Sequence, residues 1–102
     1  AARRSLEDRT RMALGEIAAL KTELEAIQAQ VRDYETLVLT AQQLVERLRP
    51  ALTEQATTLL EVLDATRALR DVEEGLVEAR QRLAQAQARL LRATGQMIEV
   101  AP

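Results

Sequence analysis

The sequence predicts an all-α protein, a long antiparallel helical hairpin of the coiled-coil type, on the basis of three observations. Apolar side chains recur every three or four residues along nearly the whole chain, and this spacing averages to the period of about 3.5 residues that is typical of helices wound around each other. The pattern in the second half mirrors the pattern in the first half. Good helix formers dominate the composition, whereas Phe and Trp are absent and Tyr34 is the single aromatic residue.

The recurring apolar positions define one seam on each expected helix. The first-half seam comprises Ala13, Ile17, Leu20, Leu24, Ile27, Val31, Tyr34, Val38, Ala41, Val45, Leu48 and Leu52. The second-half seam comprises Val62, Ala65, Leu69, Val72, Leu76, Ala79, Leu83, Ala86, Leu90, Ala93 and Met97. Nearly all of them pair across the two halves when their position numbers add up to 110, as Ile27 and Leu83 do. The chain is therefore expected to fold back near residue 55, inside the polar stretch 53–57.

The first helix is expected to span residues 5–50. Ser5 is suited to cap its start, and the carboxylates of Glu7 and Asp8 suit a helix N-terminus. Pro50 is expected to end this helix, because proline has no amide donor and restrains the residue before it. A turn over residues 51–57 then follows.

The second helix is expected to span residues 58–95. Thr58 and Glu61 have the spacing of a capping box, with a hydroxyl at the N-cap and a carboxylate three positions later. Gly95 is a suitable C-terminal stop, because glycine accepts the left-handed angles that close a helix. Residues 1–102 thus form a single helical hairpin, which we interpret as a fragment of a longer chain.

Two alternatives to this geometry follow from the same pattern. The seams also match when one helix slides by seven residues, which places the turn near residue 51.5 or 58.5, although only residue 55 lies in the polar stretch. The spacing of Leu48, Leu52, Gln55, Leu59 and Val62 nearly continues the seam through the turn, so one kinked helix in a parallel dimer is the rival geometry.

Tyr34 has a specific expected place in the preferred register. It lies opposite Leu76 and beside Gly75, where the ring meets no competing side chain. We interpret this tyrosine as part of the core between the helices. Leucine and alanine alternate along the second seam, and this alternation of large and small side chains lets two helices approach closely.

A second set of apolar side chains lies off the seams, and one partner helix cannot cover it. The set comprises Leu37, Leu39, Leu44, Leu63, Val77, Ala84, Leu91 and Ile98. Burial of a large aliphatic side chain contributes roughly 1.5–3 kcal/mol, so leaving the set in water forfeits on the order of 10 kcal/mol. The hairpin is therefore expected to pack sideways into a larger helical bundle or α-barrel, against copies of itself or against its parent chain.

Composition argues against catalysis, metal binding and nucleic-acid binding. The chain has no His and no Cys, and Ser5 is its only serine, so the common metal ligands, general bases and nucleophiles are missing. A net charge of −2, with both signs interspersed, offers no cationic face to phosphates. No apolar run approaches the roughly 20 residues that span a bilayer. We expect no enzyme activity, no cofactor and no direct membrane contact by this segment.

One acidic pair, Glu61 and Asp64, stands near the start of the second helix. Three positions apart, the two carboxylates project from neighbouring positions and would repeat around any ring of such hairpins. Carboxylates are also favoured at helix N-termini by roughly 0.3–1 kcal/mol each, without any further function. Both interpretations remain open.

The segment around these acids, Thr58–Leu69, has the sequence TLLEVLDATRAL. In it the chain resembles the TolC-like outer membrane efflux protein family, whose members carry Ser or Thr, an apolar pair, an acid, then Val-Leu-Asp-Ala and usually an arginine soon after. The similarity extends upstream to Tyr34 with Val38 and Leu39, and downstream to Leu90–Gly95, so that it covers roughly residues 9–96.

The resemblance implies a place in a channel. In that family the corresponding segment is the periplasmic end of a helical hairpin. Two such repeats per protomer and three protomers form a long α-helical tunnel, and the pattern here is closer to the second repeat, although the first is not excluded. The chain would be the helical portion of a trimeric outer-membrane efflux or export channel, a passive conduit in the periplasm. A free-standing coiled-coil scaffold or adaptor-type hairpin is the alternative function.

The resemblance also implies a docking tip and a charged channel mouth. The tip would contact the periplasmic adaptor (membrane fusion) protein of a tripartite pump through Leu52, Thr53, Glu54, Gln55, Ala56, Thr57, Thr58, Leu59 and Leu60. Glu61 and Asp64 match the family's acids near the mouth, where a ring of carboxylates would select cations. The chain departs from the family at the turn, where Leu52 and Gln55 replace an aromatic residue and a glycine, and at Pro50. These departures leave the shape of the turn open.

Overall fold

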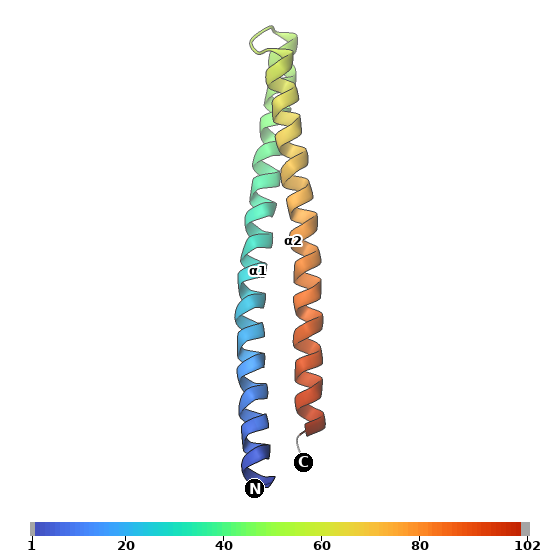
Figure 1. Ribbon diagram of the computed structural model, residues 1–102. Helices are drawn as coiled ribbons and strands as arrows, with labels where there is room; N and C mark the ends of the chain where they lie inside the picture. Colours follow the sequence, from blue (N-terminus) through green and yellow to red (C-terminus); the bar gives the residue numbers. More distant parts are fainter. Residues whose placement is uncertain (1, 101–102) are drawn as a thin grey trace. The chain divides into compact units, whose positions relative to one another are not determined.

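The computed structural model describes residues 2–100, and all of its regular secondary structure is helical. Helix α1 spans Ala2–Thr53 and helix α2 spans Leu59–Val100, with residues 54–58 between them (Figure 1). Residues 2–100 contain no strand. Within the same residues, no helical stretch combines the length and the apolar character that a membrane crossing requires. The predicted all-α class is confirmed.

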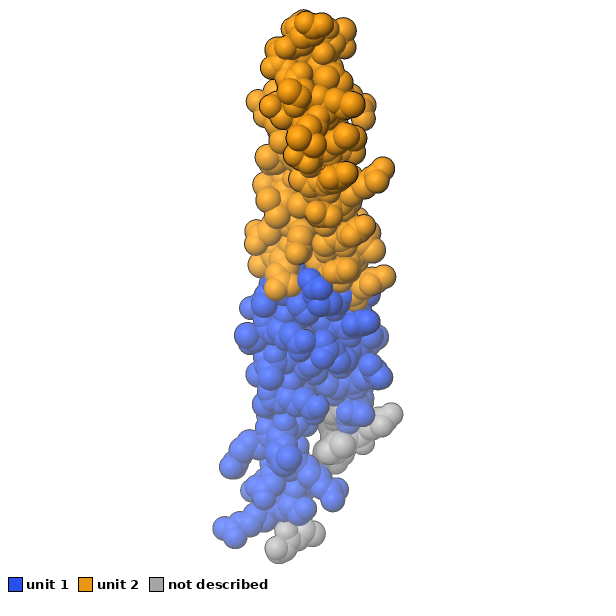
Figure 2. Space-filling model, turned by 45° about the horizontal axis from the view of Figure 1, so that its top comes forward, with its two compact units in different colours: residues 1–28, 82–102 blue, residues 29–81 orange. Residues whose placement is uncertain are grey.

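The chain divides into two compact units, and both contain parts of α1 and α2 (Figure 2). The unit of residues 29–81 holds the turn and is a complete helical hairpin. In the other unit, which combines residues 1–28 with 82–102, the remaining parts of the two helices pack against each other. There Arg89 contacts Glu23, and Gln96 and Glu16 line the same groove. The residue number rises along α2 from the first contact to the second while it falls along α1, so the two helical segments run antiparallel.

The predicted seams form the interface between the helices in each unit. Every seam residue whose side chain is described is buried or half-buried, and Met97 lies outside the described side chains. The best covered are Ala79, with 0% of its surface exposed, and Ala86, with 1%. All eight seam leucines stay half-buried, because two helices alone cannot enclose a large side chain on all sides. The alternation of leucine with alanine brings the helices close where alanine faces the partner.

Contacts in both units join positions whose numbers add up to between 109 and 115, around the register of 110 that the seams predict. Tyr34 lies against Gly75, as the sequence predicts. Arg80 lies 3.9 Å from Glu35 in the same unit, and Arg89 donates a hydrogen bond of 2.7 Å to Glu23 in the other. These contacts join residues far apart in one chain. The hairpin is therefore confirmed, and the rival of one kinked helix is not what the chain adopts.

The helix ends differ from the predicted ones. The prediction that Pro50 ends the first helix is wrong, because α1 continues to Thr53. Pro50 lies exposed in the last turns, where proline removes only one helical hydrogen bond, the bond to the carbonyl of Glu46. The carbonyl of Pro50 still accepts a hydrogen bond of 3.1 Å from the amide of Glu54. The loop is accordingly residues 54–58 rather than 51–57.

The two outer ends also extend further than predicted. Helix α1 begins at Ala2, so Ser5 lies inside the helix and does not cap it. Helix α2 begins after Thr58, close to the predicted start, and continues past Gly95 to Val100. Gly95 keeps a negative φ. Glycine permits a left-handed helix end without imposing one, and inside a helix it costs about 1 kcal/mol relative to alanine.

Ala79 provides a test of the seam, because it is the best covered residue of the interface. Ala79→Leu should lower the free energy of unfolding by about 1–3 kcal/mol, since the larger side chain has no space there. Ala68 is exposed on α2 in the same unit, so Ala68→Leu adds the same atoms and should change stability by no more than about 0.5 kcal/mol. Urea unfolding followed by circular dichroism measures both, and equal effects would contradict the seam.

Candidate functional site

The predicted tip, residues 52–60, starts with a tightly closed end of α1. The amide of Ala56 donates a hydrogen bond of 2.8 Å to the carbonyl of Ala51, and the amide of Gln55 donates one of 3.1 Å to the carbonyl of Leu52. This pair of bonds is a Schellman motif. Its left-handed residue is Gln55, with φ of 60°. The turn is thus closed by backbone hydrogen bonds that its own residues supply.

Gln55 has the backbone conformation that glycine favours, at the position where the resembled family has glycine. Sequence reasoning identified Gln55 only as a departure and left the shape of the turn open. The Schellman bonds settle that shape, with a glutamine in the left-handed region. A non-glycine residue in the left-handed region costs roughly 1–2 kcal/mol, which the closure of the helix end has to offset.

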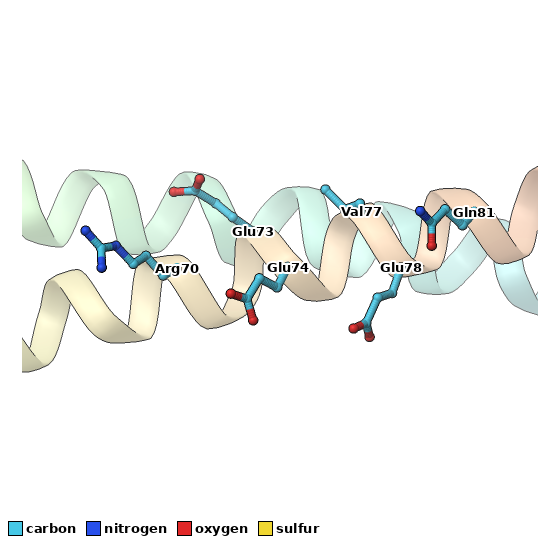
Figure 3. A pocket seen from close by; sticks show the side chains of 6 residues that line it. All are labelled: Arg70, Glu73, Glu74, Val77, Glu78 and Gln81. Carbon is cyan, nitrogen blue, oxygen red and sulfur yellow. The ribbon is translucent and has the colours of Figure 1, made fainter.

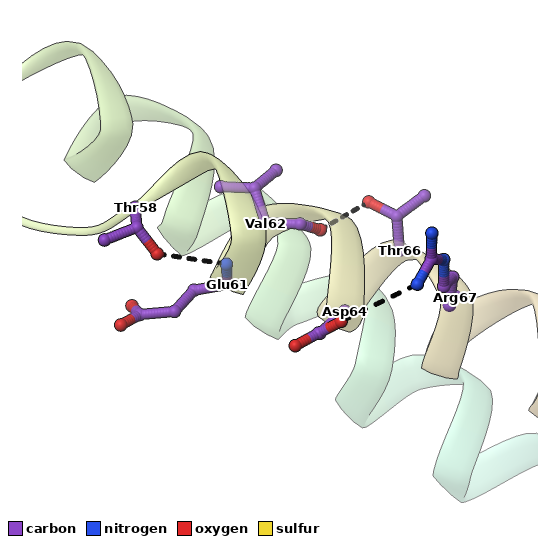
Figure 4. A network of polar contacts seen from close by, with 6 residues as sticks. All are labelled: Thr58, Glu61, Val62, Asp64, Thr66 and Arg67. Atoms are coloured by element: carbon purple, nitrogen blue, oxygen red, sulfur yellow. Dashed lines mark hydrogen bonds and ion pairs between the residues drawn. The ribbon is translucent and has the colours of Figure 1, made fainter.

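The start of α2 is closed by the predicted N-cap. The amide of Glu61 donates a hydrogen bond of 3.2 Å to the hydroxyl of Thr58, as shown in Figure 4. The carboxylate of Glu61 accepts a hydrogen bond from the hydroxyl of Thr57. The sequence predicted the Thr58 cap but not the part played by Thr57, which is half-buried in the loop. Both helix ends at the tip are therefore held by local hydrogen bonds.

Glu61 and Asp64 lie on the same side of α2, with both carboxylates exposed (Figure 4). Asp64 pairs with Arg67 across 4.0 Å, and the Asp64 side chain is 64% exposed. An exposed pair at this distance is weak, so the charge of Asp64 remains accessible to ions in solution. Glu61 belongs to the first turn of α2, where the helix dipole favours an acid. Asp64 lies beyond that turn, and the helix-terminus explanation therefore fits Glu61 better than Asp64.

The start of α2 presents three exposed leucines, which we call the leucine cluster: Leu59 and Leu60 in the tip, and Leu63 just beyond it. Their exposed fractions are 60%, 64% and 44%. Among the other predicted tip residues, Leu52 and Thr57 are half-buried. The exposed ones are Thr53, Glu54, Gln55, Ala56 and Thr58. The tip therefore combines a polar turn with an apolar surface at the start of α2, a combination suited to contact with another protein.

The apolar side chains off the seams are also exposed, and we call them the flank set. All eight members named from the sequence are exposed. The unit of residues 29–81 holds Leu37, Leu39, Leu44, Leu63 and Val77, and the other unit holds Ala84, Leu91 and Ile98. The prediction that a single partner helix leaves this set uncovered is confirmed.

Sequence reasoning missed three further exposed apolar residues at the start of α1. They are Leu6, Met12 and Leu14, with exposed fractions of 45%, 74% and 51%. Met12 and Leu14 directly flank the seam residue Ala13, so helical geometry alone places them off the seam. That signal was available in the sequence.

Across the described part of the chain, the surface depressions that the structure gives are shallow and open to solvent. The one in Figure 3 is lined by Arg70, Glu73, Glu74, Val77, Glu78 and Gln81, all of which extend from α2. Because one helix supplies every lining side chain, the depression has no opposite wall and lacks the enclosure of a small-molecule site. Among the described residues, no group of three or more acidic, His or Cys side chains is arranged to hold a metal ion.

The tip thus contains a closed turn, and the start of α2 next to it carries two acids on one side and the leucine cluster. The chain matches no protein-family model, no curated protein and no solved structure. The geometry of the tip, the exposed flank set and the sequence pattern of residues 58–69 are therefore the grounds for inferring a function.

The left-handed residue provides a test of the turn. Gln55→Gly should raise the free energy of unfolding by about 0.5–1 kcal/mol, because glycine removes the steric cost of the positive φ while adding freedom to the unfolded chain. Gln43 is exposed inside α1, so Gln43→Gly is the matched control and should lower the same quantity by about 1 kcal/mol. Urea unfolding distinguishes the expected gain in the free energy of unfolding from the expected loss. A loss of stability in both variants would contradict the described turn.

Proposed function

We propose that this chain is a periplasmic α-helical tunnel segment of an outer-membrane efflux or export channel, and that its hairpin tip docks a periplasmic adaptor protein. The observation that carries the proposal is the exposed flank set on a hairpin whose tip has the sequence pattern of the TolC-like family. In the proposed channel the segment acts as a passive conduit and a docking surface. It needs no cofactor and performs no catalysis.

The flank set supports a place inside an assembly. Val77, Leu91 and Ile98 are 54%, 75% and 71% exposed on α2, and each would gain roughly 1.5–3 kcal/mol if a neighbouring helix buried it. These residues lie one or two heptads apart, so they form a second stripe along the helix. Tunnels of the resembled family place a neighbouring hairpin at each side of every hairpin, and three protomers close the ring.

The tip supports a docking role. Leu59 and Leu60 are exposed on a turn whose two flanking helix ends are closed by their own hydrogen bonds. A surface that is ordered before binding avoids the entropy cost of ordering it in the complex. Such a tip is suited to bind the end of another helical hairpin. In the proposed pump that partner is the adaptor protein that couples the tunnel to an inner-membrane transporter.

The acids support a role at the channel mouth. Glu61 and Asp64 are exposed on one side of α2, next to the tip. Repeated around a ring of hairpins, they would form a ring of carboxylates, which favours the passage of cations. A free-standing coiled-coil scaffold would use the flank set equally well. The acid pair within the family pattern is what favours the channel.

Lateral packing predicts that the chain associates with itself through the flank set. Leu91→Glu should weaken the association at least tenfold, because it removes an apolar contact and buries a charge. Gln85→Glu adds the same charge at an exposed position of α2 away from the flank set, and should have little effect. Sedimentation velocity over a wide concentration range measures both variants. A wild-type chain that stays monomeric at high concentration would argue against lateral packing.

The channel itself is tested by charge reversal at the mouth. In the parent channel reconstituted in a planar bilayer, the double substitution Glu61→Lys and Asp64→Lys should reduce or reverse the preference for cations, because the carboxylate ring becomes cationic. Glu78→Lys is the matched control. It changes the charge at an exposed site about 21 Å beyond Asp64 along α2. Unchanged ion selectivity in the double variant would leave both acids with a purely local role at the helix start.

A further inference from the structure

The seams by themselves permit more than one register between α1 and α2. Sliding one helix by seven residues again brings seam residues opposite seam residues, so that Ile27 would meet Leu76 or Leu90 instead of Leu83. Burial of apolar surface therefore discriminates poorly between the three arrangements. A feature that fits in only one register has to add the missing specificity.

Tyr34 and Gly75 make a contact that depends on glycine. A Cβ atom placed on Gly75 would lie 2.8 Å from Cζ and 3.0 Å from Cδ1 of Tyr34, and closer still to Cε1. Carbon atoms do not approach to these distances without displacement, since favourable separations are about 3.5–4.0 Å. The ring of Tyr34 therefore occupies the space that any other residue at position 75 would fill. It is also the only aromatic ring in the chain.

The other two registers remove this fit. A slide by seven residues places Tyr34 beside Ala68 or beside Arg82, and both residues carry a Cβ. The remaining glycines show the contrast, because Gly15 and Gly95 have no atom within 4 Å of the place where a Cβ would stand. Of the three glycines, only Gly75 accommodates a neighbouring side chain.

We infer that Tyr34 and Gly75 are a register-selecting pair, which holds the two helices at the one offset where the ring has space. The pair thereby determines which residues form the turn. A slip of one heptad would move the turn away from Gln55 and Thr58 and would change the residues at the tip. This inference concerns the offset of the helices and does not depend on whether the tip docks an adaptor.

The direction in which Gly75→Ala changes the folding equilibrium constant tests the contact. In the wild-type chain it should lower the folding equilibrium constant about tenfold, because the new methyl group collides with the ring. In a Tyr34→Leu background the same substitution should raise that constant about fivefold, as alanine is the better helix former. Gly95→Ala is the control and should raise it in both backgrounds. Urea unfolding provides the constants, and a gain from Gly75→Ala in the wild-type chain would overturn the inference.

The offset itself is measured with spin labels, which attach uniquely because the chain has no cysteine. One label stands at Gln43, and the second at Arg67, Leu60 or Glu74, all exposed positions that would be nearest to Gln43 in the three registers. Neighbouring registers differ by about 10 Å along the helix axis. In the wild-type chain the pair Gln43 and Arg67 should show the shortest separation.

The decisive variant exchanges the two small residues, Ala68→Gly with Gly75→Ala, and so keeps the composition unchanged. It moves the space for the ring by one heptad, and a fraction of molecules should then show the shortest separation between Gln43 and Leu60. If the labels at Gln43 and Arg67 remain the closest in the whole population, Tyr34 and Gly75 do not select the register. The inference then fails. The double variant Tyr34→Leu with Gly75→Ala, which should remain fully folded, reports the offset without the ring.

Discussion

The pairing of two apolar seams, each with a seven-residue repeat, is the interaction on which the rest of this structure depends. Ala79 and Ala86 are almost completely covered at the interface, and Leu83 between them is half-buried. Alanine permits close approach and leucine supplies apolar area, so neither residue alone would give the same interface. Without this pairing the helices would have no partner, since isolated helices are stabilised mainly by packing of an amphipathic face.

The same seam explains why apolar surface is left over. A narrow interface between two helices uses about two positions in seven on each helix, and it cannot reach side chains on the flanks. Leu37, Val77 and Leu91 therefore remain exposed although they are hydrophobic. The exposed flank set follows from the geometry of a two-helix structure, and it is the reason why we propose that this chain belongs to an assembly of several hairpins. The turn places Glu61 and Asp64 next to the tip.

The sequence was sufficient where periodicity and local chemistry act alone. The hairpin, the seams, the Thr58 cap and the contact of Tyr34 with Gly75 all follow from spacing or from one residue's chemistry. The errors occurred where a residue permits an outcome without imposing it. Pro50 loses a single hydrogen bond near a helix end, and Gly95 continues the helix although it could have closed it. The left-handed conformation of Gln55 and the bond from Thr57 to Glu61 depend on the closed turn as a whole, which no single residue reveals.

Antiparallel pairing within one molecule is the central claim, and one distance tests it most directly. Ala26 and Ala84 are exposed, lie beside Ile27 and Leu83, and belong to the same compact unit. Spin labels at these two positions, diluted with unlabelled protein, should be separated by less than about 30 Å, because packed helix axes lie about 8–10 Å apart. A separation near 85 Å, which is about the length of continuous helix between these positions, would contradict the hairpin and with it every inference about the tip and the flanks.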